Sequence, residues 1–103
     1  MSEYCQPVPA DAPDPGRVVQ SWAATVAALP IGSRVSGQVF VRAQFGVFLV
    51  IDGVPDAVGL AEITAMPHPM ELPAAGASVT GKVVWHAHNH QVKIKLDEWD
   101  RSE

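Results

Sequence analysis

Five short strand-like stretches lie between residues 35 and 96, and they limit the folds open to this chain. Three of them alternate apolar and polar residues, and the other two, residues 45–51 and 58–63, are mostly apolar. A period of two is typical of strands that bury one face and expose the other. The stretches are residues 35–42, 45–51, 58–63, 79–86 and 92–96. Five short strands in so little sequence predict a small closed or nearly closed barrel. Gly37 and Gly81 lie inside two of them, where glycine suits the sharp coiling of a barrel.

Turn-forming residues separate the predicted strands. Asp52 and Gly53 are a strong turn signal, and Pro55 predicts an irregular connection before the third strand. Residues 64–76 contain three prolines and predict a loop with room for one helical turn. Residues 88–90 predict a turn before the last strand.

One helix is predicted ahead of the barrel, over residues 15–29. Asp14 followed by Pro15 is typical of a helix start, because the carboxylate accepts free backbone N–H groups and proline suits the first helical position. Pro30 and Gly32 end the helix. Larger apolar residues recur at spacings of four, four and three on one helix face: Val18, Trp22, Val26 and Leu29. A helix of this length is marginal alone, so we expect this face to dock on another part of the protein.

Charge and composition separate the ends of the chain from its middle. The 103 residues carry a net charge of -4 and are 48% hydrophobic, which predicts one packed domain. Residues 21–96 hold five basic and four acidic side chains, so the acidity lies near the ends and the middle permits nucleic-acid contact. Residues 1–14 are expected to form a proline-rich flexible leader, residues 31–97 the barrel domain, and residues 98–103 an acidic tail.

Several classes of protein are not expected. No apolar run approaches the roughly 20 residues that cross a bilayer, and the stretch Met1–Cys5 lacks the features of a secretory signal. The single cysteine, Cys5, excludes an internal disulfide framework and a multi-cysteine zinc site. We therefore expect a cytoplasmic protein without membrane contact, cofactor or metal. No catalytic motif is present, so no enzymatic activity is expected.

Four segments, in this order and spacing, resemble the S1-type RNA-binding domain, a family named for the ribosomal protein in which it is repeated. They are Gly-x-x-Val-x-Gly-x-Val at residues 32–39, Phe-Gly-x-Phe at 45–48, Gly-Leu-x-x-Ile at 59–63 and Gly-x-x-Val-x-x-Lys-Val at 76–83. The resemblance covers about residues 30–97. It implies a mainly β fold, a five-stranded OB-fold barrel preceded here by the predicted helix, and single-stranded RNA bound on one barrel face.

The resemblance also implies which residues bind RNA. Phe45 and Phe48 match two family phenylalanines that offer flat faces for base stacking. Glu62 stands where the family has a histidine, and its carboxylate repels phosphates although it accepts hydrogen bonds from base amino groups. The basic residue of the last strand corresponds to Lys93, with His90 as a second option.

The remaining basic and histidine residues have two interpretations each. The basic strand residues are either solvated or in contact with phosphate: Arg42, Lys82, Lys93 and Lys95. Phosphate contact predicts binding that weakens steeply with salt. Three histidines occupy the last hairpin, where the family usually has an aspartate: His86, His88 and His90. No carboxylate or cysteine lies at a helpful spacing, which favours surface histidines over a metal site.

The aromatic residues leave a structural alternative open. Phe45 and Phe48 are three residues apart, so on a regular strand they would not share a face unless the chain twists or bulges at Gly46. The two rings are then either core residues, or at least one of them lies at the surface and stacks on bases. Trp85 is expected in the core together with Trp22, and Trp99 is expected against the barrel or the helix.

Two functions are therefore compared. The first is weak, sequence-tolerant binding of single-stranded RNA through stacking and basic strand residues. The alternative is a barrel that has lost RNA binding and acts as a protein–protein interaction module, which Glu62 and the net charge of -4 favour. The sequence indicates no oligomeric state.

Overall fold

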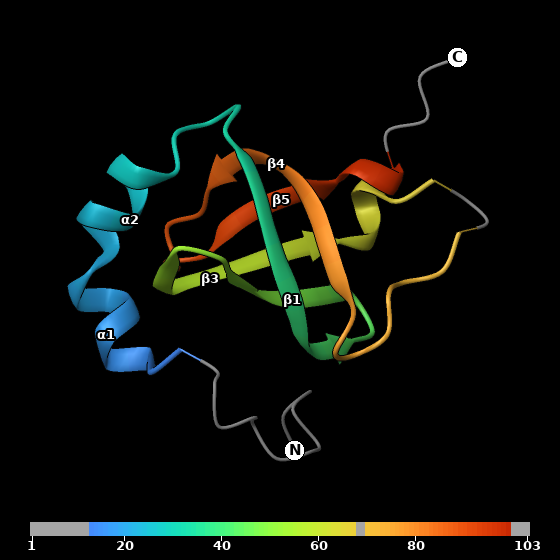
Figure 1. The fold of residues 1–103 in the computed structure, drawn as a ribbon, viewed down its shortest axis with the longest axis horizontal. Coiled ribbons are helices and arrows are strands. Elements are labelled where there is room, and N and C mark those ends of the chain that lie inside the picture. Colours follow the sequence, from blue (N-terminus) through green and yellow to red (C-terminus); the bar gives the residue numbers. More distant parts are fainter. Residues whose placement is uncertain (1–12, 68–69, 100–103) are drawn as a thin grey trace.

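Residues 13–67 and 70–99, which the computed structural model describes, form a closed five-stranded barrel with two short helices beside it (Figure 1). The strands are β1 (Arg34–Ala43), β2 (Gly46–Ile51), β3 (Val54–Glu62), β4 (Ser78–His86) and β5 (Val92–Leu96). This confirms the predicted mainly β fold and five-stranded barrel. The predictions for residues 1–12 and from residue 100 onward fall outside the described residues.

The strand order β1-β2-β3-β5-β4 closes on itself because β4 pairs with β1. All neighbouring strands are antiparallel except β3 and β5, which run parallel. β3 begins at Val54, four residues earlier than predicted, and includes Pro55. The irregularity expected from the proline appears instead in the β2–β3 register, which shifts between Val50, paired with Val58, and Ile51, paired with Val54.

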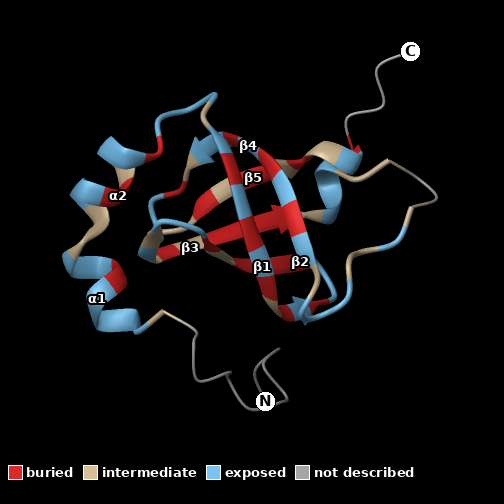
Figure 2. Ribbon diagram, in the orientation of Figure 1, coloured by how far each residue is buried: buried red, intermediate tan, exposed pale blue. Residues whose placement is uncertain are grey.

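Alternate residues of every strand fill the inside of the barrel (Figure 2). Leu49 and Ile94 are typical members, with at most 2% of their surface exposed. Trp99, in a short 3-10 turn (Asp97–Trp99) after β5, packs into the same core as expected. A Cβ at Gly81 would overlap the carbonyl oxygen of Lys95, so only glycine permits the close approach of β4 and β5.

A second apolar cluster lies on the outside of the barrel. It consists of Val41, Ala43, Phe48 and Leu60, with Phe40 and Val58 packed against it. A β-bulge produces it: Val39 pairs with Leu49 and Val41 with Phe48, which leaves Phe40 as an extra residue in β1. Beyond this bulge the alternation of β1 is reversed, so Val41 packs outward against Phe48.

The N-terminal helical segment is two helices, α1 (Pro15–Gln20) and α2 (Trp22–Ala28), rather than one helix over residues 15–29. Its start is as predicted, because the Asp14 carboxylate accepts the Arg17 backbone N–H at 3.1 Å. The break falls at Ser21, whose hydroxyl donates to Asp56 of β3 at 2.9 Å. This bond fixes the joint between the helices to the barrel.

The helices dock on one end of the barrel, as the apolar stripe predicted (Figure 1). Val18 and Leu29 are buried, but so is Thr25, which the stripe did not include. At the end of α2, the Nε2–H of His86 donates to the carbonyl oxygen of Leu29 at 2.6 Å. Within the described residues, no helix is both long enough and apolar enough to cross a membrane.

Candidate nucleic-acid interface

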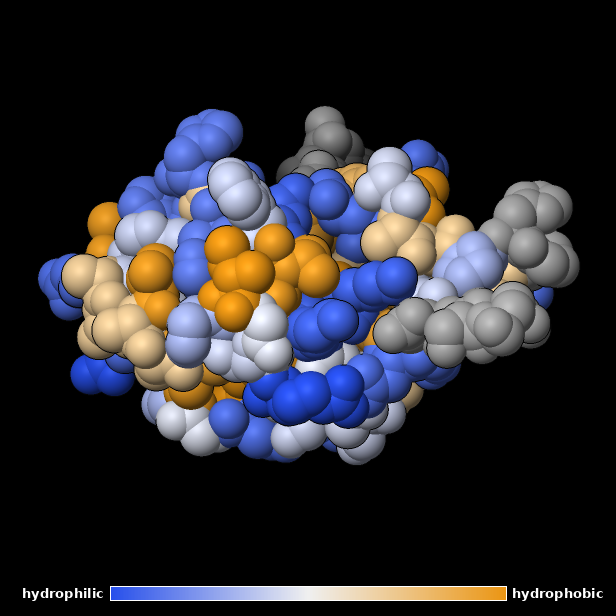
Figure 3. Space-filling model, turned by 90° about the horizontal axis from the view of Figure 1, so that it is seen from above, coloured by the Kyte–Doolittle hydropathy of each residue, from blue (hydrophilic) through white to orange (hydrophobic). Residues whose placement is uncertain are grey.

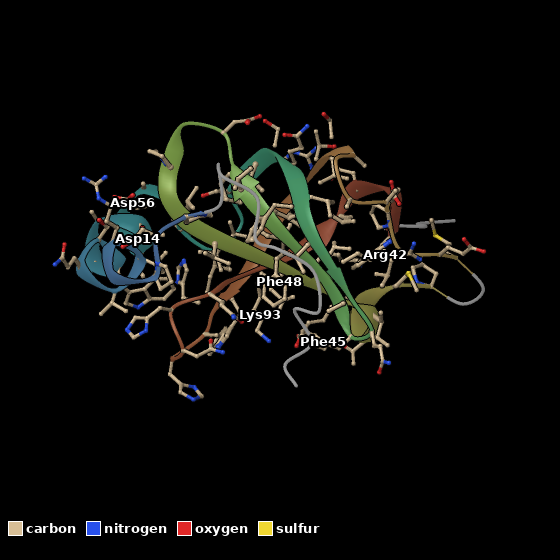
Figure 4. The ribbon with its side chains drawn as sticks, turned by 90° about the horizontal axis from the view of Figure 1, so that it is seen from below. Asp14, Arg42, Phe45, Phe48, Asp56 and Lys93 are labelled. Carbon is tan, nitrogen blue, oxygen red and sulfur yellow. The ribbon has the colours of Figure 1, made fainter. Side chains whose placement is uncertain are left out.

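Half of the predicted RNA-binding residues lie on or beside the outer surface of β2, β3 and β5, and Figure 4 labels three of them: Phe45, Phe48 and Lys93. Phe48 of β2 pairs with Leu60 of β3, and Leu60 lies in register with Lys93 of β5. Cross-strand partners point to the same side of a sheet, so these three side chains share the outer face. We call this surface, completed by Phe45 and Glu62, the phenylalanine face.

Phe45 lies in the turn between β1 and β2 rather than in a strand. Its ring stands perpendicular to that of Phe48, with the ring centroids 5.8 Å apart. The spacing of three therefore does place the two rings side by side, because Phe45 lies in the turn and Phe48 in the strand that follows it. A Cβ at Gly46 would overlap the carbonyl oxygen of Ala61, so glycine permits this close crossing of β2 over β3.

The two phenylalanine rings differ in their exposure. Phe45 is 37% exposed, whereas Phe48 is only 2% exposed and packs within the outer cluster. Of the two alternatives left open for these rings, a surface position holds for Phe45 and a buried position holds for Phe48. Phe48 instead supports Phe45 edge-on, and it also contacts Phe40, with ring centroids 6.3 Å apart.

An ion pair lies beside these rings. The Lys93 ammonium is 2.8 Å from Glu62 Oε1, and the two side chains are 24% and 37% exposed. Glu62, at the position of the family histidine, therefore neutralises the lysine that was expected to meet phosphate. A phosphate that approaches Lys93 has to compete with this carboxylate.

Arg42 does not belong to the phenylalanine face. It pairs with Val47, a residue of the barrel interior, so it lies on the opposite side of β1 from Val41. In Figure 4 it lies apart from Phe45, Phe48 and Lys93.

Lys82 and Lys95 lie elsewhere on the barrel, where they pair with each other across β4 and β5. The alternation predicted for the last strand is confirmed, because Val92, Ile94 and Leu96 are buried and the lysines between them point outward. Only Lys93 of the two β5 lysines is in register with β3.

His90 lies near the other end of the phenylalanine face, where its ring stands edge-on to Trp22 at 5.4 Å between centroids. An apolar groove of about 610 Å³ separates α1 from the barrel there. The groove is lined by Pro15, Val18, Phe40, Phe48, Val58 and His90, among others. His90 and Phe48 thus line the same groove.

The other two histidines of the hairpin have separate surroundings. His86 is bonded to Leu29 under α2, while His88 is exposed in the turn. Among the described residues, no three histidine, cysteine or acidic side chains are arranged to hold a metal ion.

Trp85 is the aromatic residue whose place differs most from the prediction. It is 59% exposed, although its alternation with Val79, Gly81 and Val83 predicts a core position. The β4–β5 register shifts between Val83 and Trp85, so Val84 is a bulge residue and Trp85 points outward beside Lys93. No local signal in the sequence reveals this bulge.

Asp97 lies directly after β5 and is the one described titratable group whose pKa is clearly shifted. Its carboxylate accepts the Thr80 hydroxyl at 2.7 Å and the Arg34 guanidinium at 2.5 Å. The Thr80 hydrogen bond, followed by that of Arg34, lowers the pKa of Asp97 below its usual value.

No known protein family and no curated protein matches this sequence. Solved structures do share its fold. RNase R from Mycoplasma genitalium is 18% identical with a TM-score of 0.64, over 78% of this chain and 15% of that enzyme. A complex of the same enzyme with ribose-methylated single-stranded RNA gives 16% identity and a TM-score of 0.63, over 77% of this chain and 14% of the enzyme.

Two further solved structures share the fold. GSP13 from Bacillus subtilis is 20% identical with a TM-score of 0.58, over 73% of this chain and 61% of that protein. A chain of the a/eIF2alpha–aDim2p–rRNA complex from Pyrococcus horikoshii is 18% identical with a TM-score of 0.58, over 69% of this chain and 46% of its own length. The chain thus spans less than two-thirds of each of these proteins. All of these structures are 20% identical to this chain or less, and the likeness shows a shared barrel fold that is consistent with an OB fold.

Proposed function

We propose that this protein binds single-stranded RNA on the phenylalanine face, weakly, with little sequence preference and without catalysis. The observation that carries the proposal is the Phe45 ring, which is exposed and held edge-on by the buried Phe48. An aromatic ring held in this way is a platform for a base, and stacking tolerates any sequence because every base has a π-face. The structure of RNase R with single-stranded RNA supports RNA as the class of partner, because that enzyme shares this fold.

The Glu62–Lys93 pair explains why the affinity is expected to be low. Lys93 is placed to meet a phosphate next to the stacked base, but its charge is already balanced at 2.8 Å. Binding at physiological salt is then expected in the range of about 1–100 μM, which is typical of non-specific nucleic-acid contacts.

Fluorescence anisotropy of a short labelled single-stranded RNA at low salt tests the proposal. Wild type should bind, and Phe45→Ala should weaken binding by the equivalent of about 1–3 kcal/mol, the contribution of one stacked base. Ile31→Ala is the matched control, because Ile31 is also exposed but precedes β1 and lies away from the Phe45 turn. No binding by wild type, or equal binding by Phe45→Ala, contradicts the proposal. Phe48→Ala is unsuitable because Phe48 is buried.

A second candidate function is binding of a protein through the apolar groove beside α1. The groove is favoured by its apolar lining, and Val19 on its rim is 55% exposed. Sedimentation velocity of wild type and Val19→Arg over a range of concentrations tests self-association through the groove. Association that disappears in Val19→Arg, in a protein that fails to bind RNA, would favour this second function.

A further inference from the structure

The outer surface of β1, β4 and β5 holds a row of basic residues that the phenylalanine face does not use. Arg34 of β1 pairs with Lys82 of β4, and Lys82 pairs with Lys95 of β5. Directly opposite residues on neighbouring strands have Cβ atoms about 4.5–5.5 Å apart. The three side chains therefore form a continuous basic row across the outside of the sheet.

The exposed Trp85 lies next to this row. Its partner Lys93 is two residues before Lys95 on β5, which is roughly 7 Å along the strand. Trp85 is 59% exposed and the bulge residue Val84 is 40% exposed, so the ring is not covered by the barrel. Figure 3, which views the molecule from above, shows an apolar patch bordered by strongly hydrophilic residues.

The charges of this surface favour an anionic partner. Arg34 is paired with Asp97, and Lys93 with Glu62. Lys95 forms no ion pair with a described carboxylate. Lys82 forms none either, although its charge also acts on the nearby Asp97 carboxylate. Two unpaired lysines beside an exposed tryptophan combine the two features of a single-strand site, namely backbone charge and a stacking ring.

We propose that Trp85 is a second stacking platform and that Lys82 and Lys95 bind the adjoining phosphates. The proposal rests on the RNA-binding function proposed above and extends its footprint from the phenylalanine face around β5. Lys93 joins the two surfaces, because it is in register with Leu60 on one side and paired with Trp85 on the other. A bound strand thus passes from Phe45 over Lys93 to Trp85.

Tryptophan fluorescence tests the stacking directly. The chain has three tryptophans, of which Trp99 is buried and Trp22 is partly covered by His86 and His90. Titration with unlabelled single-stranded RNA of roughly 16 nucleotides, the upper site size of OB folds, should quench the emission. In Trp85→Phe the quenching should disappear, while anisotropy still reports binding. Quenching that persists in Trp85→Phe, or wild-type binding without quenching, overturns the proposal.

Length and salt provide a second readout that does not depend on Trp85 emission. In wild type, an RNA of roughly 16 nucleotides should bind more tightly than one of roughly 4, because only the longer one reaches both platforms. In Trp85→Ala this advantage should shrink, and Val19→Ala, which removes an exposed apolar side chain from α1, should keep it. Lys82→Gln and Lys95→Gln should each lower the salt slope by about 0.7, because each removes one cation that neutralises a phosphate. Unchanged slopes and an unchanged length effect count against the proposal.

The outcomes separate this proposal from the function on which it rests. If wild type binds and Phe45→Ala weakens binding, but the Trp85 and lysine variants behave as wild type, only the second platform is wrong. If wild type binds no RNA, both proposals are wrong. If Trp85 emission changes with protein concentration in the absence of RNA, the surface is a contact between copies of the chain, and the RNA assignment of Trp85 is wrong.

Discussion

Two β-bulges in the same barrel have opposite effects on the aromatic residues next to them. In β1 the extra residue is Phe40, and the reversed alternation turns Val41 onto Phe48, so that Phe48 is buried in an outer cluster. In β4 the extra residue is Val84, and the reversal turns Trp85 into solvent beside Lys93. A bulge changes which face a side chain takes, but its surroundings decide whether the ring is covered.

The two surfaces also differ in charge. On the phenylalanine face, Lys93 is paired with Glu62. On the β1–β4–β5 surface, Lys82 and Lys95 are unpaired among the described residues. The phenylalanine face, which the family resemblance indicates, is therefore the more neutral of the two. The surface with unpaired lysines was found only from the strand register. The affinity for RNA is thus expected to depend on both surfaces and not on the phenylalanine face only.

The largest predicted effect compares a buried tryptophan with an exposed one. Trp99→Ala should lower the free energy of unfolding by about 3–5 kcal/mol, because it empties a space in the barrel core. Trp85→Ala should change it by no more than about 0.5 kcal/mol, because its ring is exposed. Urea denaturation followed by circular dichroism measures both. An equal loss of unfolding free energy in the two variants would mean that Trp85 is a core residue, as simple alternation predicts. The two bulges would then not differ in their effect on the neighbouring ring.

An intermediate effect is expected from the ion pair. Glu62→Gln should tighten RNA binding about two- to fivefold, because the neutral amide frees Lys93 for phosphate. The size follows from the free energy of a partly exposed ion pair, which is about 0.5–1 kcal/mol. Anisotropy at low salt measures the change, and Glu71→Gln, an exposed carboxylate in the segment before β4, is the control. Weaker binding by Glu62→Gln would instead indicate that the carboxylate accepts hydrogen bonds from bases.

The smallest effect concerns Asp97, which holds Arg34 at the end of the basic row. Because hydrogen bonds from Thr80 and Arg34 lower the pKa of Asp97 below 3.8, this interaction stabilises the fold above about pH 3.8. The stability is lost as the pH falls through the lowered pKa. Urea denaturation of wild type and Asp97→Asn should show a small, constant difference from pH 7 to about pH 5, which disappears at lower pH. A difference that grows on acidification would contradict this assignment.

Parts of the candidate site were predictable from the residues. The Phe45–Gly46 turn and Phe48 lie together as their family positions imply, and Lys93 lies beside them. Arg42 lies on the other side of β1 from Val41, because its register with Val47 follows a bulge that no residue signals. Helix α1 ends early because of a hydrogen bond from Ser21 to Asp56, a residue 35 positions away. Interactions of this range are invisible to local propensity.

Alternation, turn residues and the ordered glycine and valine segments determined the barrel by themselves, because a period of two and short turns leave a chain of this size few other ways to bury its apolar faces. Only the tertiary structure decided the exposure of individual aromatic side chains. The reason is physical: one extra residue in a strand reverses every later side chain, and the partner strand, rather than the local sequence, fixes where that residue falls.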